Sequence, residues 1–225
     1  LFSLIKGFGG YGFPESHSAS FALLAYVSAW LKCHHPAAFY VGLLNSQPMG
    51  FYSPSQLVQD AQRHHILILP TDVNHSDWDH QLLSSDDTRQ PPIRLGLRLV
   101  KGLSQAAGKR ISDVRRQRAF TNLADLRRRA SLDRKNMEAL AAADALSSIS
   151  GHRHQTHWQT MALEDHQPLL PAEASLQHET RSEVRLPTPS LGEEVLADYQ
   201  STGLSLKAHP LALLRTQYPF SQCTT

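Results

Sequence analysis

Short runs of apolar residues at helical spacing, each ended by turn residues, are the dominant pattern of this sequence. The longest run covers residues 19–31, where Leu24 and Leu31 follow Phe21 after about one and three helical turns. Nearly every position of this run is apolar, so we expect this helix to be largely buried. The pattern limits the chain to a fold of many short helices around modest cores.

Cap residues predict where further helices begin. Pro36 suits the first position of a helix, and the buried side of that helix is expected to consist of Phe39, Tyr40, Leu43 and Leu44. Ser53 and Pro54 form an N-cap followed by a Pro at the first helical position, which predicts a helix through about His64. Gly203 is placed to end the last of five further helices, predicted over residues 104–117, 122–129, 134–142, 151–163 and 193–202.

Two segments follow the period of a strand. Residues 66–69 form a short apolar run closed by Pro70, and residues 93–97 alternate apolar with polar or small side chains. Residues 72–92, between them, are polar and rich in turn formers. We therefore expect a mainly α fold with a few short strands, an α+β class. Residues 164–190 hold four prolines and little periodicity, which predicts a flexible linker within a partly disordered tail.

Composition narrows the class of protein. With 225 residues, 41% of them apolar, the chain can bury one moderate core or two small ones. It contains no run of 18 apolar residues, so no transmembrane span and no membrane partner are expected. Only Cys33 and Cys223 are present, far apart, which favours a reducing cytosol and a cytoplasmic location. The chain opens at Leu1 without a Met, and we expect it to be a piece of a longer protein.

The distribution of charge is more informative than the formal net charge of +2. Residues 98–135 contain twelve Lys or Arg and three Asp, a balance of +9 within 38 residues. Residues 164–198 reverse this balance, with eight acidic residues against Arg181 and Arg185. A charge run is often only a solvated helical face, but a block this basic also suits a polyanion such as DNA.

A tight turn inside the basic block predicts a phosphate-binding site. The segment Leu99-Val100-Lys101-Gly102-Leu103-Ser104 precedes a helix that begins with small residues. Gly102 allows a sharp turn and a close approach of the backbone to a ligand, and Ser104 is placed to cap the helix. The free N–H groups of the first helical turn attract an anion without reading bases. The predicted DNA-binding residues are Lys101, Gly102, Ser104, Gly108, Lys109 and Arg110.

This arrangement resembles one hairpin of a tandem helix-hairpin-helix DNA-binding domain. The second half is less similar, although Leu132, Met137, Leu140 and Leu146 have suitable spacing. The stretch Ala141-Ala142-Ala143-Asp144-Ala145 stands where such domains usually carry a Gly, so we interpret the second hairpin as structural.

Several collinear segments resemble the late fingers region of the bacterial C-family DNA polymerases, the family of the DNA polymerase III α-subunit. They are Gly9-Gly10-Tyr11-Gly12-Phe13, Ser16-His17-Ser18-Ala19-Ser20-Phe21-Ala22, His35-Pro36-Ala37-Ala38-Phe39-Tyr40, Leu69-Pro70-Thr71-Asp72-Val73-Asn74 and Gly96-Leu97-Arg98-Leu99-Val100-Lys101-Gly102. Within the family, Asn74-His75-Ser76-Asp77-Trp78-Asp79 and Gly151-His152-Arg153 look closer to the error-prone, damage-tolerant branch.

The resemblance implies a domain organisation. It places late fingers helices at 1–65, a short-strand connector at 66–97, a helix-hairpin-helix domain at 98–163, the linker at 164–190 and a helix leading to a missing OB-fold at 191–225.

The resemblance also implies a function. Family members add deoxynucleotides to DNA, using Mg²⁺ held by palm aspartates that lie upstream of the region similar to this chain. We therefore expect no catalytic residue here, and no cofactor in this chain, with Mg²⁺, deoxynucleotides and other damage-response polymerase subunits as partners of the complete enzyme. Ser16, His17 and Ser18 are candidates for a supporting role near the polymerase active site.

Other readings of these residues stay open. Ser16, His17 and Ser18 also fit a nucleophilic site, but adjacency does not supply the geometry of a base and its orienting group, and capping of a helix over 19–31 is an equal alternative. Thirteen histidines invite a zinc site, yet none has the spacing of a zinc motif, so no metal ligand is predicted. The chain could also be an independent, non-catalytic DNA-binding or interaction protein related to the polymerases.

Overall fold

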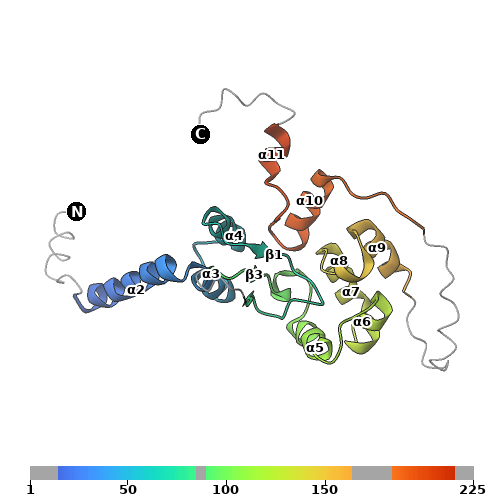
Figure 1. The fold of residues 1–225 in the computed structure, drawn as a ribbon, viewed down its shortest axis with the longest axis horizontal. Coiled ribbons are helices and arrows are strands. Elements are labelled where there is room, and N and C mark those ends of the chain that lie inside the picture. The colour runs from blue at the N-terminus through green and yellow to red at the C-terminus, as the bar shows by residue number, and fades with distance from the viewer. Residues whose placement is uncertain (1–14, 85–89, 164–183, 216–225) are drawn as a thin grey trace, which may run out of the picture.

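The computed structural model describes residues 15–84, 90–163 and 184–215 of the chain, the side chains of residues 15 and 16 excepted (Figure 1). Ten α-helices lie in these ranges: α2 (Glu15–His34), α3 (Pro36–Asn45), α4 (Pro54–Arg63), α5 (Gln105–Arg115), α6 (Leu123–Arg129), α7 (Arg134–Ala142), α8 (Ser147–Ser150), α9 (Arg153–Met161), α10 (Leu191–Ser201) and α11 (Pro210–Arg215). With one small sheet, this confirms the predicted mainly α fold with a few short strands. None of the described helices combines the length and the apolar character that a membrane crossing requires.

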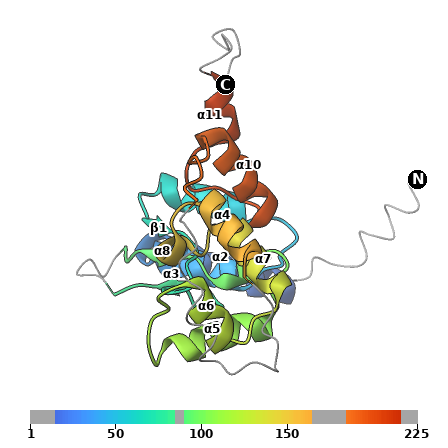
Figure 2. The same cartoon turned by 90° about the vertical axis from the view of Figure 1, so that its right-hand side faces the viewer.

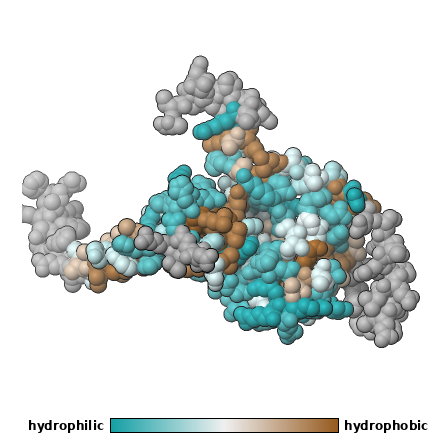
Figure 3. Space-filling model, in the orientation of Figure 1, coloured by the Kyte–Doolittle hydropathy of each residue, from teal (hydrophilic) through white to brown (hydrophobic). Residues whose placement is uncertain are grey.

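Helix α2 projects from the body of the molecule, and α3 is its main packing partner (Figure 1). Phe21 is 57% exposed and Tyr26 is 69% exposed. The prediction that this helix is largely buried is therefore wrong for the described residues. An apolar sequence gives a helix a surface to bury, but the described elements cover only part of that surface (Figure 3).

The sheet consists of three two-residue strands in the order β1-β3-β2. β1 (Ile68–Leu69) pairs in parallel with β3 (Ile93–Arg94), and β2 (Gln81–Leu82) pairs with β3 in antiparallel fashion. β1 and β3 were predicted at longer bounds, whereas β2 lies in the segment expected to be only turns. Its two residues carry no apolar alternation that could have revealed it.

The first core joins this sheet to α3 and α4. Its buried members include Tyr40, Leu44, Val58 and Ile93, all at most 1% exposed. The predicted starts of both helices are confirmed, since Pro36 occupies the first turn of α3 and Ser53 forms a capping box with Gln56 at α4.

The second core lies among α5, α6, α7 and the turns between them. Its largest fully buried side chains are those of Leu97, Ile111, Leu126, Met137, Leu140 and Leu146. The short 3₁₀ helix η1 (Leu97–Leu99) carries the chain from the sheet into this second core. Two modest cores thus hold the molecule, as the length and composition allow.

Helix α10 returns to this second part of the molecule after the described chain resumes at residue 184 (Figures 1 and 2). Gly203 follows α10 with a φ of 86°, so the predicted helix end is confirmed. Most of the predicted linker, residues 164–183, lies outside the described residues. Its last part contacts α9, because the Leu186 N–H donates to Gln155 and the Pro187 carbonyl lies 3.0 Å from Nδ1 of His154.

Candidate nucleic-acid interface

The predicted turn at Gly102 is a tight hairpin between η1 and α5. Val100 and Leu103 are 3% and 7% exposed, so they anchor the hairpin in the core, and the Leu103 N–H donates to the Val100 carbonyl at 3.2 Å. Gly102 has a φ of 87°, a left-handed value that favours glycine. We call residues 100–104 the first hairpin.

The first turn of α5 presents backbone donors to solvent. Ser104 is the N-cap, and its hydroxyl accepts from the Ala107 N–H at 3.2 Å. Gln105 and Ala106 are exposed, and their N–H groups have no acceptor within the helix because they lie in its first turn. With the positive end of the helix dipole, these donors form a site suited to a phosphate.

Lys109 lies one turn further along α5. It is exposed, and its ammonium has no partner among the described residues. Arg110 is engaged instead, since its guanidinium donates to the carbonyl oxygens of Ala130 at 2.9 Å and Ser131 at 3.2 Å. Arg110 thereby ties α5 to the turn that follows α6.

Gly108 faces the interior of the molecule. It is buried, and a Cβ built at this position would lie 2.4 Å from Cε3 of Trp78. The glycine therefore lets the indole ring lie against α5, and the structure does not bring it to the surface that holds Ser104 and Lys109.

Lys101 is engaged with the end of α10. Its ammonium donates to the carbonyl oxygens of Tyr199 at 3.0 Å and Gln200 at 2.9 Å, and its own N–H donates to the Ser201 carbonyl at 2.9 Å. Of the three basic residues predicted to contact DNA, Lys109 is thus the one whose side chain has no bonding partner among the described residues.

Backbone carbonyl groups are partners of many cations in the basic block. Arg115 donates to the carbonyl oxygens of Val73 and Ser76 and also pairs with Asp77. Burial raises the pKa of Asp77, but the hydrogen bond from Gln81 and the positive charge of Arg115 outweigh this, so its pKa lies below the ordinary value. These partners were not predicted, because a backbone carbonyl has no sequence signature.

Arg129 has a similar role in α6. It donates to the carbonyl oxygens of Val114 and Arg118, each at 2.9 Å, and pairs with Asp125 at 3.1 Å. Its guanidinium also lies 4.9 Å from the centre of the Phe120 ring. Arg129 therefore helps to hold the turn between α5 and α6, which is a structural role.

The second hairpin, residues 142–146, differs from the first in the charge at its tip. Asp144 takes the left-handed conformation there with a φ of 57°, and its carboxylate lies 3.1 Å from Nζ of Lys207. The following helix, α8, has only four residues and no side-chain cap. This geometry agrees with the interpretation of the second hairpin as structural.

Ser16, His17 and Ser18 lie within α2, which begins at Glu15. The alternative that they cap a helix starting at residue 19 is therefore wrong. The His17 ring packs against that of Phe21 in a tilted arrangement, with 4.4 Å between ring centres. Figure 1 shows α2 extending away from the body of the molecule that holds α5, so the structure does not bring these residues to the first hairpin.

The described residues contain no group of three His, Cys, Asp or Glu side chains arranged to hold a metal ion. His80, a histidine not singled out from sequence, is 3% exposed and accepts a hydrogen bond from the Gly96 N–H at 3.1 Å. Burial lowers the pKa of His80 to about 4, so it is neutral near pH 7.

Comparison with known proteins agrees with this geometry. Residues 65–156 match the family model described as "Helix-hairpin-helix motif". The chain is 53% identical over 229 residues to the "Error-prone DNA polymerase" of Teredinibacter turnerae, an alignment that covers 99% of this chain and 21% of that protein. The proteins of the same name from Saccharophagus degradans and Ralstonia nicotianae are 53% and 56% identical, with 99% and 94% of this chain covered and 22% and 20% of the relatives. The chain spans about a fifth of the length of these curated relatives. Over nearly all of its residues the chain is therefore similar to one part of the error-prone DNA polymerases.

Proposed function

We propose that this chain supplies sequence-independent DNA backbone binding to an error-prone DNA polymerase that acts in damage-induced synthesis. The observation that carries the proposal is the first hairpin, where Gly102 turns the chain into α5 and the first-turn N–H groups face solvent beside Lys109. Nucleotide addition, the Mg²⁺ that it needs and the deoxynucleotides belong to other parts of the longer enzyme, and α2 and α3 support its fingers.

The chemistry of the first hairpin explains why it would bind the backbone and not the bases. Backbone N–H donors and one ammonium group match the charge and the acceptor oxygens of a phosphate. The side chains at the first turn of α5 are those of Ser104, Gln105 and Ala106, and the Ser104 hydroxyl is occupied by capping. Such a surface holds the duplex and lets it slide, which suits an enzyme that moves along DNA.

Replacing Lys109 with Ala tests the proposal. The exposed ammonium of Lys109 has no described partner, so its loss removes one phosphate contact and leaves the fold unchanged. The affinity for duplex DNA should fall, and the slope of log K against log salt should decrease by about 0.9. Fluorescence anisotropy at several salt concentrations, with two duplexes of unrelated sequence, measures both quantities.

Arg63→Ala is the matched control. Arg63 is exposed at the end of α4, which lies away from α5 in Figure 1, and its loss changes the net charge by the same amount. It should leave the salt slope unchanged. Equal effects of the two variants, or no effect of either, would contradict the proposed role of the first hairpin.

A further inference from the structure

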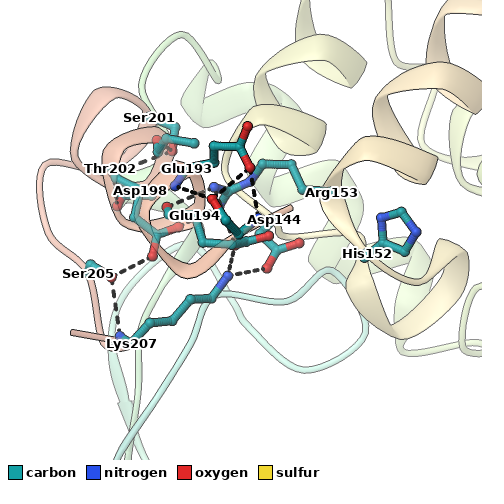
Figure 4. Close-up of polar contacts among 12 residues, drawn as sticks. Asp144, His152, Arg153, Glu193, Glu194, Asp198, Ser201, Thr202, Ser205 and Lys207 are labelled. Atoms are coloured by element: carbon teal, nitrogen blue, oxygen red, sulfur yellow. Dashed lines mark hydrogen bonds and ion pairs between the residues drawn. The ribbon is translucent and has the colours of Figure 1, made fainter. Parts of the chain in front are cut away.

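A buried network of charges fixes α10 to α9. Arg153, at the first position of α9, is 6% exposed, and its guanidinium lies between Glu194 and Asp198 of α10 (Figure 4). It donates to the Glu194 carbonyl oxygen at 3.0 Å, lies 3.5 Å from the Glu194 carboxylate and pairs with Asp198. Removal of one partner from a buried ion pair is strongly destabilising, so each member is important for docking.

The chain after α10 extends the same network to the second hairpin. Lys207 pairs with Glu194 and lies 3.1 Å from Asp144 at the tip of that hairpin. The Ser205 hydroxyl donates to the other oxygen of Asp198 at 2.7 Å. Figure 4 shows these groups pointing toward one another from three separate parts of the chain.

The C-terminal end of α10 contacts the first hairpin. The C-terminal carbonyls of α10 accept three hydrogen bonds from Lys101, two from the ammonium and one from the backbone N–H. A cation at the C-terminus of a helix is favourable, because the last carbonyls carry the negative end of the dipole. The residue next to Lys101 is Gly102, so these bonds fix the chain at the point where the hairpin turns.

From these contacts we infer that Lys101 is a positioning residue, and that docked α10 acts as a brace that holds the first hairpin in the conformation that binds DNA. The inference rests on the proposed function of that hairpin. Arg153 and Lys207 fix α10 through its carboxylates, Arg153 through Asp198 and Lys207 through Glu194. Lys101 bonds to the C-terminal end of α10 and so fixes the backbone next to Gly102. The ammonium of Lys101 then serves α10 and not a phosphate.

If α10 positions the first hairpin, the effect of Asp198→Ala on the affinity for DNA is opposite to the effect expected from charge alone. Asp198→Ala removes a negative charge and therefore strengthens attraction to DNA if charge alone decides the affinity. If α10 positions the hairpin, the same substitution loosens α10 and weakens binding. We expect about a fivefold loss of affinity, the lower end of ordinary coupling between separate sites.

Glu138→Ala is the matched control for Asp198→Ala. Glu138 pairs with Arg134 on the exposed side of α7, outside the network, and its loss changes the net charge equally. The affinity of the Glu138→Ala variant for duplex DNA should equal or exceed that of the unmodified chain. Equal or tighter binding by Asp198→Ala would overturn the inference.

Lys101→Met provides a second test that does not depend on DNA. Lys101 is exposed, so the variant should fold, but hydrogen exchange of the amides in residues 199–203 should accelerate in the absence of DNA. If Lys101 is a phosphate contact, exchange in this segment stays unchanged and the inference fails. The double variant with Asp198→Ala should bind DNA no more weakly than Asp198→Ala alone, because both changes release the same brace; additive losses would refute it.

The two proposals can fail separately. If the unmodified 225-residue chain does not bind duplex DNA, the proposed function of the hairpin is wrong. The exchange measurement on Lys101→Met still decides whether Lys101 holds α10. If the chain binds DNA and Lys109→Ala weakens it while Asp198→Ala does not, the function holds and the brace is wrong.

Discussion

Replacement of Gly108 by Ala distinguishes a packing role for this glycine from a role in binding phosphate. A Cβ here would lie 2.4 Å from Cε3 and 2.9 Å from Cζ3 of the Trp78 ring. Distances this short do not persist, so the indole or α5 must shift. The ring is partly buried against the second core, and the backbone that carries it is held in place, because the Trp78 carbonyl accepts from the Arg98 N–H at 3.0 Å and the preceding Asp77 pairs with Arg115.

The expected size of the effect follows from two opposing contributions. Ala is more favourable than Gly inside a helix by about 1 kcal/mol. Forcing a methyl group into a filled site costs about 1–3 kcal/mol, and contact with two ring atoms places the cost at the upper end. The net loss of unfolding free energy is about 1–2 kcal/mol, which lowers the melting temperature of a chain of this size by about 3–6 °C.

Thermal unfolding followed by circular dichroism measures this difference, with Gly42→Ala as the matched control. Gly42 also lies inside a helix, α3, but a Cβ there would meet nothing within 4 Å. Gly42→Ala should therefore gain up to about 1 kcal/mol of stability. If Gly108→Ala melts at or above the temperature of Gly42→Ala, the packing argument is refuted. If it melts normally but loses affinity for DNA, Gly108 belongs to the phosphate site.

Two further predictions concern the first hairpin and the buried histidine. Gly102→Ala should lower the free energy of unfolding by about 1–2 kcal/mol, because a φ of 87° strains an L-residue. The added Cβ would make only an ordinary 3.7 Å contact with Ala139, so steric overlap adds nothing. An unchanged midpoint of urea unfolding would contradict this. Burial lowers the pKa of His80 from 6.5 to about 4, so the unfolded state gains its proton first as the pH falls. The contribution of His80 to the free energy of unfolding is fully present above about pH 6.5 and should fall by up to about 3 kcal/mol toward pH 4. His80→Asn should flatten this part of the pH profile. An equally steep profile in that variant would show that other groups are responsible.

The features predicted correctly from sequence are those that depend on local chemistry. Ser53 and Ser104 cap their helices because a hydroxyl one residue before a helix can reach the N–H groups of its first turn. Gly102 and Gly203 occupy left-handed positions that other residues rarely adopt. Helix α8 was missed because a single turn of four residues, Ser147–Ser150, has no apolar periodicity. Helix α11 was missed for a similar reason, since its six residues give one apolar turn.

The burial of α2 could not be predicted in this way, because burial depends on what covers a surface. The sequence of α2 is apolar on nearly every side, which indicates a helix with partners. Within the described residues α3 covers only its last part, and Leu23, Leu24 and Tyr26 remain at least 60% exposed. Apolar content therefore predicts that a surface will be buried but does not identify the element that buries it.

For the basic block, residues 98–135, the sequence likewise gives the charges but does not show what each charged side chain contacts. Six of its twelve cations donate to backbone carbonyl oxygens, namely Arg98, Lys101, Arg110, Arg115, Arg127 and Arg129. A carbonyl group is neutral, so its hydrogen bond leaves the charge of the cation in place to attract DNA over a distance, although Arg98, Arg115 and Arg129 also pair with an Asp carboxylate. The six cations are held in place, however, and cannot reach a phosphate without breaking bonds that stabilise the fold.

A count of charges therefore overstates the number of phosphate contacts. Lys109 and Lys135 are the cations of the block that have no partner among the described residues. If each neutralises one phosphate, the salt slope should be closer to about 2 than to the value of about 8 that a balance of +9 suggests. A measured slope near 2 would mean that the block attracts DNA but that few side chains bind it. A slope near 8 would require the carbonyl-bound cations to exchange partners when DNA binds.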